Sequence, residues 1–124
     1  MNKETFIEYV SDTYGVTPDC PFTDDYVSKV FRHPSNRKWF ALLMEIGLNK
    51  LSPDKKGEEY VINLKCEPAA FDLRKKKGVY PAYHMNKEHW ITVVLKEAEE
   101  EDIKFLTDIS FNLTLPKTKG GKRK

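Results

Sequence analysis

Residues Tyr80–Leu95 have the sequence YPAYHMNKEHWITVVL, which predicts two strands joined by a tight turn. The residues Val79–His84 have the composition of a strand, and the dipeptide Asn86-Lys87 suits the turn of a hairpin. The run His89–Leu95 then alternates between two faces, as a strand with one buried face does. This hairpin indicates an antiparallel sheet.

Alternation also predicts which side chains of the sheet face the core. In the last strand we expect Ile91, Val93 and Leu95 in the core and Trp90 on the open face of the sheet. The run Glu59–Cys66 predicts a strand of the same kind. Its two faces are Tyr60, Ile62, Leu64 and Cys66 on one side, and Val61, Asn63 and Lys65 on the other. The second of these faces is expected to meet solvent or a partner.

The rest of the chain predicts three helices and two further strands. The helices are expected over Asn2–Tyr14, over Glu67–Lys77, and from the acidic run Glu97–Asp102 to about Leu115; the strands are expected over Tyr26–His33 and Lys38–Ile46. The order α-β3-α-β2-α with tight hairpins predicts an α+β fold. We expect a two-layer sandwich whose five-stranded sheet is mainly antiparallel and carries the helices on one face.

Length and charge indicate one domain followed by a basic tail. The chain has 124 residues, which suits a single domain over residues 1–116. Residues 117–124, KTKGGKRK, carry five positive charges, and we expect this tail to be disordered. Without the tail, 16 of the 21 Lys and Arg residues remain against 19 Asp and Glu residues, a net charge of −3. Nucleic-acid binding would therefore need a local basic face or the tail.

The sequence offers little support for catalysis, a metal site or a membrane segment. Cys20 and Cys66 form no CxxC pattern, and we expect them to be reduced thiols. Ser28 or Cys66 could be imagined beside His84 as a nucleophile, and His84 with His89 as metal ligands, but no activating or further ligating residue accompanies them. We expect a monomeric, cytoplasmic protein that is not an enzyme and uses no cofactor or metal.

Three segments stand out in the sequence: INLKCEP from Ile62, YPAYHMNKEHW from Tyr80 and, more loosely, KWFALL from Lys38. Together they resemble the MmcQ/YjbR-like family of small bacterial proteins, which are commonly labelled DNA-binding. The resemblance implies an α-β3-α-β2-α domain with a hairpin arrangement described as a double wing, and it implies no catalytic residue. The family's motif positions here are Asn63, Lys65, Tyr83, His84, Met85, Asn86, Lys87, His89 and Trp90.

Two functional hypotheses from different classes follow. In the first, the protein binds DNA through Lys65, Lys87 and Trp90 on the open sheet face. The basic residues at the tip of the preceding hairpin, together with the tail, would add phosphate contacts. Those tip residues are Arg32, Arg37 and Lys38.

In the second hypothesis, Trp90 belongs to an aromatic patch that binds a protein or a small ligand. The remaining patch residues are Asn63, Tyr83, His84, Met85, Asn86 and His89. A third interpretation gives the motif only the structural role of building the hairpin.

Overall fold

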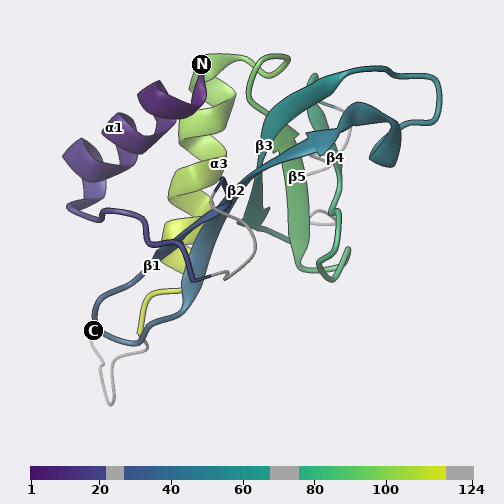
Figure 1. Ribbon diagram of the computed structural model, residues 1–124. Coiled ribbons are helices and arrows are strands. Elements are labelled where there is room, and N and C mark those ends of the chain that lie inside the picture. The colour runs from purple at the N-terminus through teal and green to yellow at the C-terminus, as the bar shows by residue number, and fades with distance from the viewer. Residues whose placement is uncertain (22–26, 68–75, 117–124) are drawn as a thin grey trace.

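The structure, a computed structural model, describes residues 1–21, 27–67 and 76–116. Two helices, α1 (Lys3–Tyr14) and α3 (Glu100–Leu113), pack against one face of a five-stranded sheet, as Figure 1 shows. The architecture is α+β with an antiparallel sheet, as predicted. The helix expected over Glu67–Lys77 and the tail expected at 117–124 fall largely or wholly outside the described residues.

The sheet has the strand order β1-β2-β3-β5-β4, and every neighbouring pair is antiparallel. The strands are β1 (Lys29–Arg32), β2 (Trp39–Gly47), β3 (Glu58–Lys65), β4 (Val79–Pro81) and β5 (Trp90–Val94). A short 3-10 helix, η1 (Leu48–Lys50), begins the connection between β2 and β3. The two hairpins predicted from the sequence are therefore confirmed, with shorter outer strands than expected.

The first helix begins and ends where its capping residues predict. The side chain of Asn2 accepts a hydrogen bond from the Thr5 N–H at 2.8 Å, which satisfies one of the free donors at the helix start. Gly15 ends the helix with a φ of 68°, a left-handed conformation that glycine adopts without steric cost. Acidic residues fill the first turn of α3, where they oppose the positive end of the helix dipole.

Each face of the sheet carries its own apolar cluster. The first lies between the sheet and the helices and contains Ile91, Val93 and Leu95, as predicted. The second lies on the opposite face and contains Val61 and Val94, which have no exposed surface. Other members of the second cluster are Val30, Leu42, Met44, Ile46 and Leu48.

The expectation that this second face is open is therefore wrong over most of its area. Leu48 and Leu51 of the connection between β2 and β3 pack against the second cluster, and so does Tyr83 of the connection between β4 and β5. The two leucines lie in a stretch whose sequence is typical of a turn, and Tyr83 lies beyond the end of β4 although the sequence predicted a strand up to His84. Among the described residues, no helix is long and apolar enough to cross a membrane.

Candidate functional site

An irregularity in β2 decides which way Trp39 points. Phe31 of β1 pairs with Ala41, and Arg32 pairs with Trp39, so Phe40 between them has no partner on β1. This extra residue is a β-bulge, which shifts the alternation of side chains along the strand. Phe40 is buried in the core beside the helices, whereas Trp39 is half-buried against the second cluster. The bulge therefore brings Trp39 to the sheet face that lies away from the helices.

The strands β2 and β3 separate at the same end of the sheet. The last residues that pair between them are Ala41 and Leu64. One residue further on, the hydroxyl of Ser110 on α3 accepts a hydrogen bond from the Lys65 N–H at 2.8 Å and donates one to the Phe40 carbonyl. A helix side chain thus occupies the place of a direct bond between the strands, and the two backbones are held apart.

A hollow of about 260 Å³ lies at this end of the sheet. Both tryptophans of the chain and three cationic side chains contribute to its lining. The lining residues are Arg37, Lys38, Trp39, Lys65, Trp90 and Thr114. Lys65 and Trp90 are cross-strand partners on β3 and β5, so their side chains are neighbours on one face. We call this site, where segments far apart in the sequence meet, the Trp–Lys hollow.

The charge of the Trp–Lys hollow is positive and not neutralised within the described part of the chain. Arg37 and Lys38 are exposed, and Lys65 is half-buried. No described carboxylate lies within ion-pairing distance of any of these three cations, whereas other described cations, such as Arg32 and Lys55, have such partners. Unpaired cations beside aromatic rings suit an anionic ligand that has a planar group.

The tip that carries Arg37 is fastened to the end of α3. The imidazole Nε2 of His33 lies 2.8 Å from the Thr114 hydroxyl and 3.0 Å from the Phe111 carbonyl oxygen. The Asn36 side-chain amide donates to the Thr114 carbonyl oxygen at 3.0 Å. Figure 1 shows the turn between β1 and β2 beside the end of α3. Burial lowers the pKa of His33, so the neutral imidazole is the form that stabilises this contact.

Of the six residues predicted to contact nucleic acid, four line the Trp–Lys hollow. The other two lie apart from it. The guanidinium of Arg32 forms two hydrogen bonds of 3.0 Å with the carboxylate of Asp19, so its charge is already compensated. Lys87 is exposed on the connection between β4 and β5 and does not line the hollow.

The motif residue Asn63 has a structural role that explains its burial. The Thr92 hydroxyl donates to Asn63 Oδ1 at 2.5 Å, and the Asn63 amide donates to the Tyr83 carbonyl at 2.9 Å. The Tyr83 N–H donates to the Thr92 hydroxyl at 2.8 Å. These three hydrogen bonds hold the connection between β4 and β5 down on the sheet.

The other motif residues build the turn of that connection. His84 is exposed and has a φ of 64°, and its ring lies against that of Tyr83 at a tilt of 40°, with 3.8 Å between ring centroids. The Asn86 side chain accepts from the Glu88 N–H at 2.7 Å, which stabilises the turn. The His89 carbonyl accepts from the Cys66 N–H at 2.8 Å, and Met85 is half-buried.

Sequence reasoning did not find three residues of this region: Trp39, Thr114 and Ser110. The bulge made the face of Trp39 unpredictable, because alternation predicts the face of a strand residue correctly only where the pairing of the strands is regular. Ser110 and Thr114 lie on or just after α3, and only the packing of that helix brings them to the strand ends. The clue in the sequence was the position of Trp39 directly after the basic residues Arg37 and Lys38.

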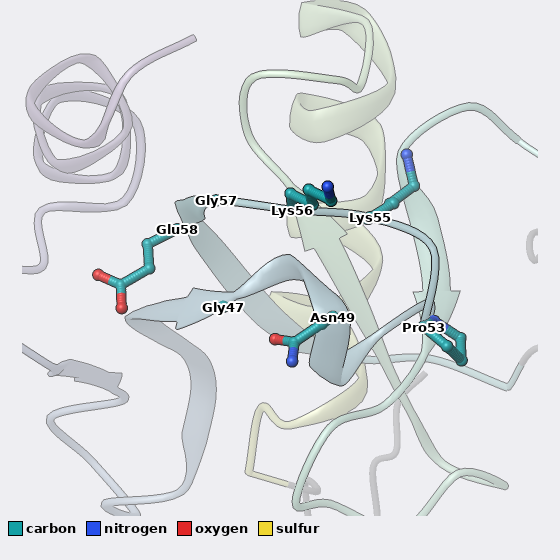
Figure 2. A pocket seen from close by; sticks show the side chains of 7 residues that line it. All are labelled: Gly47, Asn49, Pro53, Lys55, Lys56, Gly57 and Glu58. Atoms are coloured by element: carbon teal, nitrogen blue, oxygen red, sulfur yellow. The ribbon is translucent and has the colours of Figure 1, made fainter.

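A second hollow, of about 470 Å³, lies in the connection between β2 and β3. Figure 2 shows Lys55 and Lys56 along one side of it, Asn49 opposite them, and the Glu58 side chain directed away. The Lys55 ammonium forms an ion pair of 3.2 Å with Glu97, which also accepts from the Tyr80 hydroxyl. Among the described residues that line this hollow none is aromatic, and one of the two lysines is neutralised by Glu97.

The described residues contain no group of three His, Cys, Asp or Glu side chains that could hold a metal ion. Cys66 is buried, and this burial raises the pKa of its thiol, which disfavours the reactive thiolate. Cys20 is exposed. The Trp–Lys hollow brings three cationic side chains and two tryptophan rings together.

Comparisons with known proteins place this architecture in a family. The sequence model described as YjbR matches residues 11–113. The uncharacterized protein YyaQ of Bacillus subtilis (strain 168) is 41% identical over 118 residues, which cover 92% of this chain and 98% of that protein. Both matches extend over nearly the whole described fold.

Solved structures agree with the fold. A crystal structure of a Pseudomonas syringae protein superposes with a TM-score of 0.87 at 45% identity and covers 93% of this chain and 100% of that chain. A solution NMR structure from the same species gives 0.86 at 42% identity, covering 99% and 100% of the two chains. The Deinococcus radiodurans protein DR2400, described with a DUF419 domain, shares the fold with a TM-score of 0.63 at 24% identity and covers 100% and 97%. On these matches, the chain belongs to the YjbR family.

Proposed function

We propose that this protein is a DNA-binding module and not an enzyme, and that the Trp–Lys hollow is the contact site. The observation that carries the proposal is the grouping of Arg37, Lys38 and Lys65 around two tryptophans, with no described carboxylate to neutralise them. Protein cations bind DNA by neutralising backbone phosphates and releasing counterions. Tryptophan adds a ring surface on which bases stack.

The charge distribution supports local binding instead of a general electrostatic field. The chain without residues 117–124 has a net charge of −3, so its overall charge does not attract DNA. Binding then depends on local positive charge such as that of the hollow. The five cations of the tail follow Thr114, which lines the hollow, by only a few residues in the sequence. We propose that the tail adds phosphate contacts to those of the hollow.

A titration of DNA at two salt concentrations tests this proposal. Fluorescence anisotropy of a labelled oligonucleotide should show binding at about 50 mM salt that weakens steeply by about 200 mM. The variant Lys65→Gln should reduce the slope of log affinity against log salt by about 0.7–0.9, which is the contribution of one phosphate contact. The matched control Lys56→Gln changes an exposed lysine of the second hollow and should leave the slope unchanged. Absence of binding at low salt would remove the proposal.

A protein or small-ligand site is the second candidate. The concave shape of the hollow favours this candidate, as does the packing of Tyr83 against the same apolar cluster as Trp39. Aromatic side chains with polar groups are favoured at interfaces. Tryptophan emission that responds to a free nucleotide or an acidic peptide, but not to an oligonucleotide, would support it over DNA.

A further inference from the structure

Both tryptophans of the chain lie in one recess, on a face of the sheet that is otherwise covered. Trp90 is half-buried at the start of β5, and Trp39 is half-buried at the start of β2, directly before the bulge. A domain of this size usually buries its tryptophans or uses them at an interface. Here the two large rings end in a hollow that also holds three cations. This combination indicates a ligand with a flat apolar face and a negative charge beside it.

We propose that the Trp–Lys hollow takes an unpaired nucleobase, so that the preferred ligand is single-stranded instead of duplex nucleic acid. This inference rests on the proposed function and specifies its substrate. Proteins that bind single strands combine a cationic groove for the phosphates with aromatic side chains on which the bases stack. The hollow contains both components within six residues.

The size of the hollow limits what can enter it. At about 260 Å³ it lies just below the range of about 300–1,000 Å³ that is typical of small-molecule sites. A single base with part of its sugar fits that space better than a longer stacked segment does. In a duplex the bases are stacked inside and expose only their edges in the grooves. A recessed tryptophan could reach the face of a base only after that base had left the stack.

The position of the cations fits a single nucleic-acid strand that crosses the hollow. Arg37 and Lys38 are exposed at the hairpin tip before β2. Lys65 lies at the end of β3, next to Trp90 on the neighbouring strand. These cations come from two separate segments that line one hollow, so a base stacked there would have its flanking phosphates near them. One planar group between two anionic groups is the repeating pattern of a single strand.

The hairpin tip is also poorly suited to enter a groove of duplex DNA. His33 and Asn36 fasten it to Thr114 at the end of α3, so the tip lies against the domain. Readout of a major groove usually needs a helix or a two-stranded ribbon that projects into it. The second hollow has two lysines and, among its described lining residues, no aromatic ring on which a base could stack.

Three probes with the wild-type protein test the inference. They are a single-stranded oligonucleotide of about 12 nucleotides, its duplex, and an abasic strand of the same length. Binding is followed by anisotropy and by tryptophan emission, which reports on this site because both tryptophans line it. We expect the single strand to bind at least about tenfold more tightly than either other probe. We also expect only the single strand to quench the emission strongly.

Two other results would overturn the inference in distinguishable ways. Equal binding of the single strand and the abasic strand, or tighter binding of the duplex, would overturn the unpaired-base inference and leave DNA binding in place. Failure of every probe to bind at low salt would overturn both this inference and the proposed function. In that case the hollow would belong to a different class of partner, such as an acidic segment of a protein.

A matched pair of variants assigns the effect to the ring. Trp90→Ala should lower affinity for the single strand by about 5- to 100-fold, the range seen when a stacking aromatic is removed. It should change affinity for the abasic strand by less than about twofold, because the cations remain. Trp90→Phe retains a ring and should recover most of the lost affinity. Equal losses for both probes in Trp90→Ala, or no recovery in Trp90→Phe, would contradict base stacking.

Discussion

Thr92 donates a hydrogen bond of 2.5 Å to Oδ1 of Asn63 on the neighbouring strand, and neither residue has any exposed surface. The pair lies in an otherwise apolar face of the sheet. Its remaining hydrogen-bonding groups satisfy the N–H and carbonyl of Tyr83, so the connection between β4 and β5 lies flat on the sheet. The motif residue Asn63 is thus explained by its structural contacts with Thr92 and Tyr83.

Replacing Thr92 with Val should destabilise the protein by about 1–3 kcal/mol, because it leaves buried groups of Asn63 and Tyr83 without partners. Urea denaturation measures the loss. Asn63→Ala should cost a similar amount, and the double variant should lose less than the sum, by at least about 0.5 kcal/mol. Simple additivity of the two losses would contradict a shared network.

Ser110 offers a second test of stability. Removal of its hydroxyl in Ser110→Ala would leave the buried groups of Phe40 and Lys65 unpaired, at a cost of about 1–3 kcal/mol in the free energy of unfolding. Thr13→Ala, at an exposed position of α1, is the control and should change stability by less than about 0.5 kcal/mol. A variant Ser110→Ala as stable as the wild type would contradict this prediction. It would indicate that the Lys65 N–H and the Phe40 carbonyl bond to each other directly when the hydroxyl is absent.

The sequence predicts the regular parts of this fold well, for a physical reason. Alternation with a period of two places Ile91 and Val93 in the core and turns Trp90 away from the helices, and the structure agrees. One unpaired residue, Phe40, reverses that rule for Trp39. The local sequence does not predict this bulge, because the bulge depends on how β1 and the helices pack around the extra side chain of Phe40.

The covered second face could not be predicted for a related reason. Leu48 and Leu51 are isolated apolar residues in a polar stretch, which resembles an ordinary turn. Their burial depends on the way the connection folds back over β2 and β3, which is a tertiary effect. The Trp–Lys hollow is similar, since it forms only where two strand ends and the end of α3 meet.

His33 should make stability depend on pH. Burial holds the pKa of His33 below its ordinary value, so the folded protein resists protonation while the unfolded chain accepts a proton. Stability is therefore complete above the ordinary histidine pKa, at about pH 7.5, and declines as pH falls through about 6.5 toward the lowered folded value.

Thermal unfolding at several pH values between about 7.5 and 5 measures this decline. The variant His33→Gln retains a hydrogen-bonding side chain without a titration in this range and should show a flatter profile. His89→Gln, which changes an exposed histidine, is the control and should retain the wild-type profile. An unchanged profile in His33→Gln would show that other groups cause the decline.

The two arginines of the first hairpin make the sharpest comparison, because they differ in their partners. Arg37 lines the Trp–Lys hollow without a described carboxylate near it, whereas Arg32 is bound to Asp19 by two hydrogen bonds. Arg37→Gln should therefore weaken DNA binding and lower the salt slope by about 0.7–0.9, with little effect on stability. Arg32→Gln should instead cost up to about 1 kcal/mol of stability, as partly exposed ion pairs do. It should leave the salt slope unchanged, because its charge is already compensated in the free protein. Equal losses of affinity in both variants would mean that DNA responds to the net charge of the hairpin and not to the hollow.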